Sequence, residues 1–127
     1  MTQYKHVIVE LDVPPSANSL YVVSRQGRRI RTREYDRWRS HAIPTFKEGV
    51  ERLSEPLASG KEQIRVIITA NVDFRRDIDN LIKPIMDAAR ESCMIGDDRY
   101  CMAISIARRT FEKRLEKGRA RVELFAP

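Results

Sequence analysis

Four stretches of the chain carry the pattern of β-strands. Residues 4–13 and 100–108 alternate between apolar and polar side chains, residues 63–72 are rich in Ile and Val, and residues 119–125 form a further candidate near the end. Alternation is typical of a strand with one buried face, and a continuous apolar run is typical of a central strand. We therefore expect 63–72 at the centre of a sheet and Met102, Ile104 and Ile106 on one side of 100–108.

A long helix is predicted from Thr32, a residue type that caps helices, to about residue 53. Apolar residues recur along it at helical spacing, which predicts a stripe facing the core rather than a platform for stacking bases. The stripe consists of Tyr35, Trp38, Ala42 and Phe46. Pro44 lies inside this pattern and is expected to kink or interrupt the helix, because proline lacks the N–H group that the helix needs.

A second helix is predicted for residues 81–93, with one buried stripe. The stripe consists of Ile82, Met86, Ala89 and Cys93. Pro84 is compatible with this helix only if the helix begins close to it. Residues 20–32, around Gln26 and Gly27, predict a short hairpin or an irregular loop, and the charged residues 112–118 predict a hairpin tip between the last two strands.

These elements predict a single small α+β domain over residues 1–127, with a mixed β-sheet and two main helices packed on it. The content of 42% hydrophobic and 33% charged residues is that of a soluble globular protein. No apolar run is long enough for a transmembrane helix and no signal peptide is evident, so we expect a cytoplasmic protein with no membrane partner. In that compartment Cys93 and Cys101 are expected to be reduced core thiols rather than a disulfide.

The chain is strongly basic, with a formal net charge of +6 and a sequence pI of about 9.7. A basic balance favours a polyanionic partner such as nucleic acid. Five arginines with no acid among them precede the first helix, and they favour an arm that contacts phosphates over an ordinary solvated surface. They are Arg25, Arg28, Arg29, Arg31 and Arg33.

The residues with candidate chemistry follow the central strand. Asp77 and Asp79 would point the same way if the backbone were extended, and Asp79 or Asn80 could cap the next helix. Lys83 lies one helical turn beyond Asp79, and Asp98 could approach from the other end of that helix. Carboxylate oxygens are the ligands that Mg²⁺ prefers, and such an ion can activate a water for phosphodiester hydrolysis.

A purely structural interpretation competes with the metal site. Asp79 could serve only as a cap, and Asp97 and Asp98 could only shape a turn after Gly96. Short carboxylate motifs also arise often by chance. Asp87 lies four residues after Lys83 and would then support it through an ion pair rather than bind metal.

The chain resembles the RusA family of Holliday junction resolvases over nearly its whole length. The resemblance rests on the stretches 13–21 (VPPSANSLY), 76–83 (RDIDNLIK), 86–88 (MDA) and 95–98 (IGDD), with a basic connection at 113–118 before the last strand. It implies that Asp77, Asp79 and Asp98 are catalytic acids that bind Mg²⁺, which Mn²⁺ could replace, and that Lys83 is essential. It also implies that Asn80, and by the same likeness Asn18, lie near the DNA.

We therefore expect a dimeric, Mg²⁺-dependent endonuclease that resolves four-way DNA junctions by paired symmetric nicks in recombination and repair. The candidate DNA-binding residues are Arg76, Asn80, Asn18, Arg28, Arg29 and Arg31. The alternatives are a nuclease of other branched or flapped DNA on the same site, or a basic junction-binding protein without catalysis. No Gly-rich phosphate loop, Cys/His zinc spacing or nucleophile elbow is present, which disfavours unrelated enzyme classes. No organic cofactor is expected. A bacterial or phage context with nucleoid association is expected.

Overall fold

The computed structural model describes residues 4–109 and 114–127. Its main sheet has four strands in the order β1-β6-β4-β5. These strands are β1 (Lys5–Asp12), β6 (Arg119–Ala126), β4 (Ile64–Ala70) and β5 (Cys101–Arg108). Strand β4 is central, since it pairs antiparallel with β6 and parallel with β5. All four predicted strands are confirmed, and the sheet is mixed as expected.

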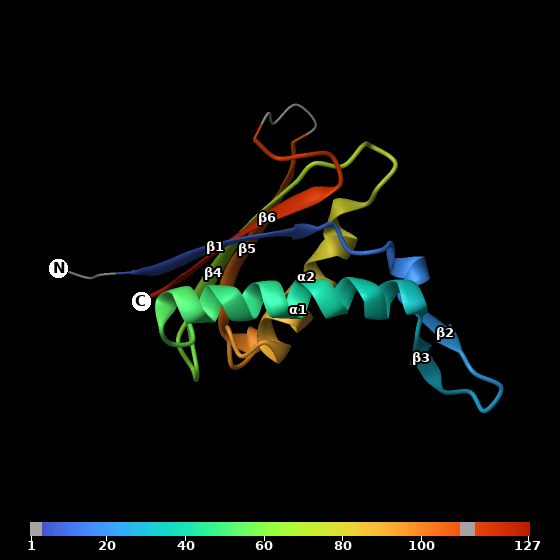
Figure 1. Cartoon of the computed structure of the whole chain (residues 1–127), viewed down its shortest axis with the longest axis horizontal. Helices are drawn as coiled ribbons and strands as arrows, with labels where there is room; N and C mark the ends of the chain where they lie inside the picture. The colour runs from blue at the N-terminus through green and yellow to red at the C-terminus, as the bar shows by residue number, and fades with distance from the viewer. Residues whose placement is uncertain (1–3, 110–113) are drawn as a thin grey trace.

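The two long helices lie on one face of this sheet (Figure 1). In β1 the inward side chains Val7 and Val9 are buried, whereas Ile8 between them is 43% exposed. Strands β4 and β6 bury alternate side chains in the same way. Because side chains alternate across a strand, the core lies between the sheet and the helices. No described helix covers the opposite face.

Helix α1 (Arg33–Leu53) begins as predicted at Thr32, whose side chain accepts a hydrogen bond of 3.1 Å from the backbone N–H of Tyr35. The predicted stripe is buried, and the indole N–H of Trp38 donates to the carbonyl oxygen of Asp12 over 2.7 Å. The helix continues through Pro44, so the expected interruption is wrong. Burial of the stripe on both sides of Pro44 compensates for its missing hydrogen bond.

Residues 21–31 form a hairpin of β2 (Tyr21–Val23) and β3 (Arg29–Arg31). Gly27 in its turn has φ of 76°, a left-handed conformation that glycine adopts without strain. The hydroxyl of Thr32 donates to the carbonyl oxygen of Ser19 over 2.5 Å, which ties the base of the hairpin to the start of α1. The hairpin extends away from the body of the molecule (Figure 1).

Helix α2 (Ile82–Glu91) follows a 3₁₀ turn, η2 (Ile78–Leu81), and is shorter than predicted. Pro84 is its third residue, which satisfies the condition that the helix begin near it. The predicted cap is wrong, because Leu81 occupies the N-cap position and no side chain caps the helix. Cys93 lies beyond the helix with φ of 65° and is exposed, so its assignment to the core is also wrong. Neither cysteine forms a disulfide.

The connection between β5 and β6 is not a hairpin, because the two strands lie on opposite sides of β4. Residues 110–113, including the first part of the predicted tip, lie outside the described residues. In the described part Leu115 is buried, and its carbonyl oxygen accepts a hydrogen bond of 2.7 Å from the Asn71 side chain. Leu115 therefore anchors this part to the body of the protein, whereas Arg114, Glu116 and Lys117 beside it are exposed. No helix in the described part of the chain is long and apolar enough to cross a membrane.

Candidate active site

Asp77 and Asp79 lie near the end of the connection from β4 to α2, just before the helix begins. Asp77 is the N-cap residue of η2 but makes no capping hydrogen bond with its side chain, and Asp79 lies within η2. Both side chains are exposed. The expectation that they share one face of an extended segment is wrong, because the chain turns at Ile78 into a 3₁₀ helix. Their accessibility leaves both carboxylates available to a ligand.

Two arginines hold the backbone that leads to Asp77. The guanidinium of Arg108, the last residue of β5, donates to the carbonyl oxygens of Asp73 and Arg76, the latter over 2.9 Å. The guanidinium of Arg76 donates to the carbonyl oxygen of Pro14 over 2.6 Å. The segment is therefore fixed both to β5 and to the proline pair after β1. The predicted DNA contact of Arg76 stays a prediction beside this positioning role.

Asp98 lies beyond the other end of α2, in a 3₁₀ turn, η3 (Asp98–Tyr100). Asp97 accepts a hydrogen bond of 2.9 Å from the backbone N–H of Arg99 and also pairs with the Arg99 side chain. Asp97 thus shapes the turn, as the structural interpretation predicted. The side chain of Asp98 is half-buried near Cys101, whose thiol pKa is raised mainly by burial and also by the Asp98 charge.

The described chain does not gather the three predicted metal ligands. Within residues 4–109 and 114–127, no group of three or more His, Cys, Asp or Glu side chains is placed to hold a metal ion. Helix α2 has ten residues and a length of about 15 Å, and residues 92–97 follow it before η3 begins. The two turns lie at opposite ends of α2 in Figure 1. The carboxylate chemistry suits Mg²⁺, but the described chain does not bring the three carboxylates into one site.

Lys83 extends from the first turn of α2, and its side chain is 70% exposed. Its ammonium nitrogen lies 2.8 Å from Oδ1 of Asp87, which confirms the predicted i, i+4 pair. Asp87 also lies 3.5 Å from the guanidinium of Arg90. Asp87 is therefore engaged by two cations of its own helix.

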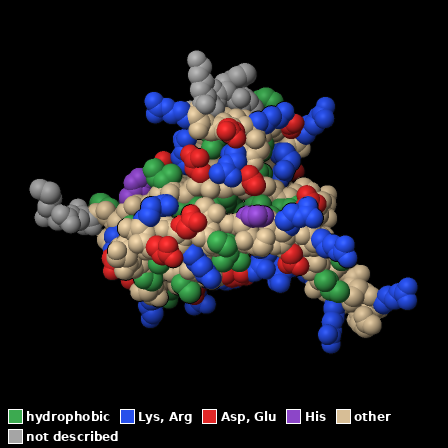
Figure 2. Space-filling model, in the orientation of Figure 1, with side chains coloured by type: hydrophobic (Ala, Val, Ile, Leu, Met, Phe, Trp, Pro, Cys, Tyr) green, Lys and Arg blue, Asp and Glu red, His purple; other side chains and the backbone are tan. Residues whose placement is uncertain are grey.

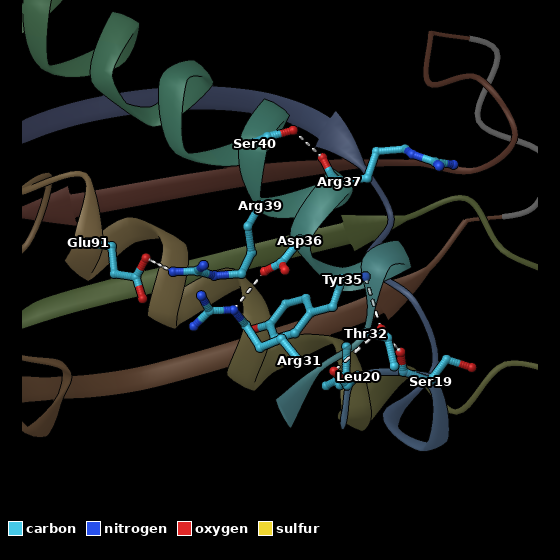
Figure 3. Close-up of polar contacts among 10 residues, drawn as sticks. All are labelled: Ser19, Leu20, Arg31, Thr32, Tyr35, Asp36, Arg37, Arg39, Ser40 and Glu91. Carbon is cyan, nitrogen blue, oxygen red and sulfur yellow. Dashed lines mark hydrogen bonds and ion pairs between the residues drawn. The ribbon is translucent and has the colours of Figure 1, made fainter. Parts of the chain in front are cut away.

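The arginines of the hairpin differ in their surroundings. Arg31 pairs with Asp36 of α1 over 2.7 Å, and this hydrogen bond raises the pKa of Arg31 (Figure 3). Arg29 lies over the ring of Tyr21, 3.7 Å from its centroid. Arg28 is exposed beside the turn, and Figure 2 shows basic side chains extending from this hairpin at the lower right. The basic hairpin therefore has an acidic neighbour, Asp36 of α1, which partly neutralises its charge.

The remaining candidate DNA contacts, Asn18 and Asn80, are exposed in separate 3₁₀ turns, η1 (Ala17–Ser19) and η2. The sequence interpretation missed Arg108, which positions the carboxylate segment. Arg108 also lies over the ring of Phe74, 5.0 Å from its centroid. The one signal for Arg108 is a cation that ends an otherwise uncharged strand.

Comparison with known proteins shows the family to which this chain belongs. The family model described as endodeoxyribonuclease RusA matches residues 12–125, which is almost the entire chain. A comparison with curated proteins returns no match. The matched range includes every candidate catalytic residue and the hairpin. The chain therefore belongs to the RusA family of endodeoxyribonucleases, enzymes that act on DNA junctions.

Proposed function

We propose that this protein is a Mg²⁺-dependent, structure-selective endonuclease that resolves four-way DNA junctions by paired symmetric nicks. The observation that carries the proposal is the family match over residues 12–125, within which Asp77, Asp79, Asp98 and Lys83 are all present. The carboxylates of Asp77 and Asp79 are exposed, and the Asp98 side chain is partly accessible, so DNA and an ion can reach them. The proposed setting is recombination and repair in a bacterial or phage context.

The proposed metal ligands are Asp77, Asp79 and Asp98, whose hard oxygen atoms suit Mg²⁺ or Mn²⁺. A bound ion of this kind lowers the pKa of a coordinated water and neutralises phosphate charge. Within the described residues of one chain, these three carboxylates do not form a group that could hold an ion.

The protein's own cations have distinct proposed tasks. Lys83 is proposed to bind the scissile phosphate, because its ammonium group is exposed and its residue lies in the first turn of α2, directly after the carboxylate turn η2. The Asp87 carboxylate keeps this side chain close to the helix in the absence of DNA. Arg28 and Arg29 of the hairpin are proposed to bind phosphates further along a junction arm.

We propose that the functional unit is a homodimer. Resolution requires equivalent nicks in two strands, and two-fold symmetry repeats the same basic surface on both halves of a junction. The protein should therefore sediment as a dimer without DNA. A protein that stays monomeric at micromolar concentration, alone and on the junction, would contradict this proposal.

A substrate panel tests the proposed function. Purified protein is incubated with four-way, three-way, flapped and linear duplex DNA in Mg²⁺, Mn²⁺, Ca²⁺ or excess chelator, and the cuts are mapped. We expect paired nicks on the four-way junction in Mg²⁺ or Mn²⁺, and binding with little cutting in Ca²⁺. Preferential cutting of flaps would indicate a different branched substrate. Equal cutting of linear duplex, or activity in chelator, would contradict the junction-resolving function.

A further inference from the structure

Phe74 is the most exposed large hydrophobic side chain in the described part of the chain, at 84%. Single exposed apolar side chains are common on soluble proteins, so exposure alone indicates no function. The position of Phe74 is what distinguishes it. It lies in the connection from β4 to α2, which extends beyond the sheet at the upper right of Figure 1. Asp77 follows it three residues later.

The turn that carries Phe74 is held by hydrogen bonds on both sides. The carboxylate of Asp73 accepts a hydrogen bond of 2.9 Å from the backbone N–H of Arg75, a contact that stabilises turns. The carbonyl oxygen of Asp73 accepts one of 3.3 Å from the backbone N–H of Arg76. The guanidinium of Arg108 donates to the carbonyl oxygens of Asp73 and Arg76. The backbone before and after Phe74 is therefore fixed.

One face of the Phe74 ring is covered and the other is open. The guanidinium of Arg108 lies over the ring, 5.0 Å from its centroid. Since 84% of the side chain is exposed, the opposite face of the ring contacts solvent. Aromatic rings stack favourably in offset face-to-face arrangements, and a cation over a ring adds to its attraction. The open face therefore fits a flat aromatic ligand such as a nucleobase.

The charges around this ring fit DNA rather than an apolar protein partner. Four arginines lie in the turn or at the adjacent end of β5, and all four are at least partly exposed. They are Arg75, Arg76, Arg108 and Arg109. Asp73 is the one acid of the turn, and its carboxylate is engaged by the backbone. Proteins that bind unpaired nucleic acid combine cations along the phosphate path with aromatic rings on which bases stack.

The ring lies near enough to the candidate carboxylates to contact the same DNA strand. The three residue steps from Phe74 to Asp77 span at most about 11 Å. Successive bases of one strand are spaced about 3.4 Å apart along the helix axis. A base on Phe74 would therefore lie within about three nucleotides of a phosphate at Asp77.

We propose that Phe74 is a stacking site for a nucleobase of the cut strand at the branch point, and that this contact favours junctions over linear duplex. Base pairs that border the opening of a four-way junction lack a stacked neighbour on one side. Displacing such a base costs less than unstacking one inside a duplex. Every base has a π-face, so the site selects DNA structure more than sequence. The inference rests on the proposed function and adds to it a residue that discriminates between substrates.

A cycle of protein and DNA changes tests the contact directly. Affinity in Ca²⁺ is measured for wild type and Phe74→Ala on four-way junctions with an abasic nucleotide at each position within three nucleotides of the branch point. At the stacked position, either change alone should weaken binding about tenfold. Both changes together should cost no more than one, because each removes the same contact. Losses that multiply at every position would overturn the inference.

Further variants separate stacking from charge and from folding. Phe74→Trp should keep junction affinity, whereas Phe74→Leu should bind like Phe74→Ala, because Leu has no π-face. The slope of log affinity against log salt should not change, since no phosphate contact is lost. Tyr4→Ala is the matched control, an exposed aromatic residue on β1's side of the sheet, and should bind like wild type. Denaturant unfolding checks the fold. Wild-type affinity in Phe74→Leu would contradict base stacking.

Photochemical crosslinking tests the contact in the wild-type protein. On irradiation, 5-iodouracil crosslinks to aromatic side chains that stack on it, and it replaces a base at each position tested above. We expect a crosslink from the four-way junction to the peptide that contains Phe74, identified by mass spectrometry. At equal occupancy the yield from linear duplex should be about tenfold lower, since its bases stay stacked on each other. Equal yields, or no crosslink from the junction, would overturn the inference.

Cleavage in Mg²⁺ separates this inference from the proposed function. A wild-type protein that shows the coupling and the crosslink but cuts no branched DNA would support the stacking site and contradict the proposed function. A wild-type protein that resolves four-way junctions but shows no coupling between Phe74 and any base would contradict the stacking site alone.

Discussion

The ammonium nitrogen of Lys83 lies 2.8 Å from Oδ1 of Asp87, one turn further along α2. The Lys83 side chain is 70% exposed, so water screens the pair and its contribution to stability is small. The contact therefore orients Lys83 more than it stabilises the helix. It leaves the charge available to a phosphate that binds more strongly than the Asp87 carboxylate.

Replacement of Lys83 by Gln should separate catalysis from stability. We expect the free energy of unfolding to change by no more than about 0.5 kcal/mol, because the lost pair is an exposed helical one. Junction cleavage should fall about a hundredfold, as expected when a group that stabilises developing charge is removed. Arg90→Gln is the matched control, since Arg90 also contacts Asp87 and should keep its activity. A Lys83→Gln protein that cuts at the wild-type rate would remove Lys83 from the site.

Arg76 links Asp77 to the segment after β1 through the carbonyl oxygen of Pro14. Arg76→Lys keeps the charge but loses the planar guanidinium that reaches this oxygen. We expect junction affinity to persist, cleavage to fall, and the free energy of unfolding to drop by about 1–3 kcal/mol. Gel shift, cleavage and denaturant unfolding measure the three effects. Arg75→Lys is the control at the adjacent exposed position, and equal behaviour of the two variants would refute the positioning role.

Gly96 allows the chain to pass close to the 58–60 segment before it reaches Asp98. A Cβ atom at Gly96 would lie 2.7 Å from the carbonyl oxygen of Ser59, which is backbone and cannot move aside easily. Gly96→Ala should therefore destabilise the protein by about 1–3 kcal/mol and displace Asp98. At Gly60 a Cβ would meet its nearest atom, in the Glu62 carboxylate, at an ordinary 3.5 Å. Denaturant unfolding should show little change for Gly60→Ala, and an equally mild effect at Gly96 would contradict the crowding argument.

The hairpin should contribute to DNA affinity through phosphate contacts. Replacing Arg28 and Arg29 by Ala should weaken junction binding and reduce the slope of log affinity against log salt by roughly one for each lost contact. Arg31→Ala should change the slope less, because Asp36 already pairs with Arg31. Binding isotherms at several salt concentrations measure these slopes. An unchanged slope in the double variant would make the cluster an ordinary solvated surface.

Local patterns predicted the elements well, since the stripe of α1 and the apolar run of β4 are properties of short segments. Pairing between distant segments was harder to foresee. The position of β6 between β1 and β4, and the uncovered edge at β5, depend on contacts that no periodicity reveals. This is why a hairpin was expected between two strands that are not neighbours.

The candidate site, like the fold, could be predicted from the sequence only in part. The sequence alone identifies Asp77, Asp79 and Lys83 as candidate site residues, and the spacing of Lys83 and Asp87 predicts their ion pair. The 3₁₀ turn that begins at Ile78 cannot be predicted in this way, because the sequence is also compatible with an extended backbone there. The separation of Asp98 from the other carboxylates follows from how α2 packs, which is a tertiary property.

The central claim is that the carboxylates perform catalysis, and Asp79→Asn tests it most directly. Asn keeps the size of the side chain, Asp79 is exposed, and its side chain caps neither η2 nor α2, so the fold should survive. Loss of one anionic oxygen should reduce cleavage by at least about a hundredfold, a few kcal/mol of transition-state stabilisation. Junction binding in chelator should persist or tighten, since repulsion of phosphates decreases.

The measurement is a gel shift and a cleavage assay on the same preparations, with circular dichroism as the folding check. Asp98→Asn should behave like Asp79→Asn. Asp97→Asn is the control, because Asn can replace Asp97 as the cap of η3. The account predicts a folded Asp79→Asn protein that binds the four-way junction and does not cut it. A folded Asp79→Asn protein that cuts at the wild-type rate would contradict the account at its centre.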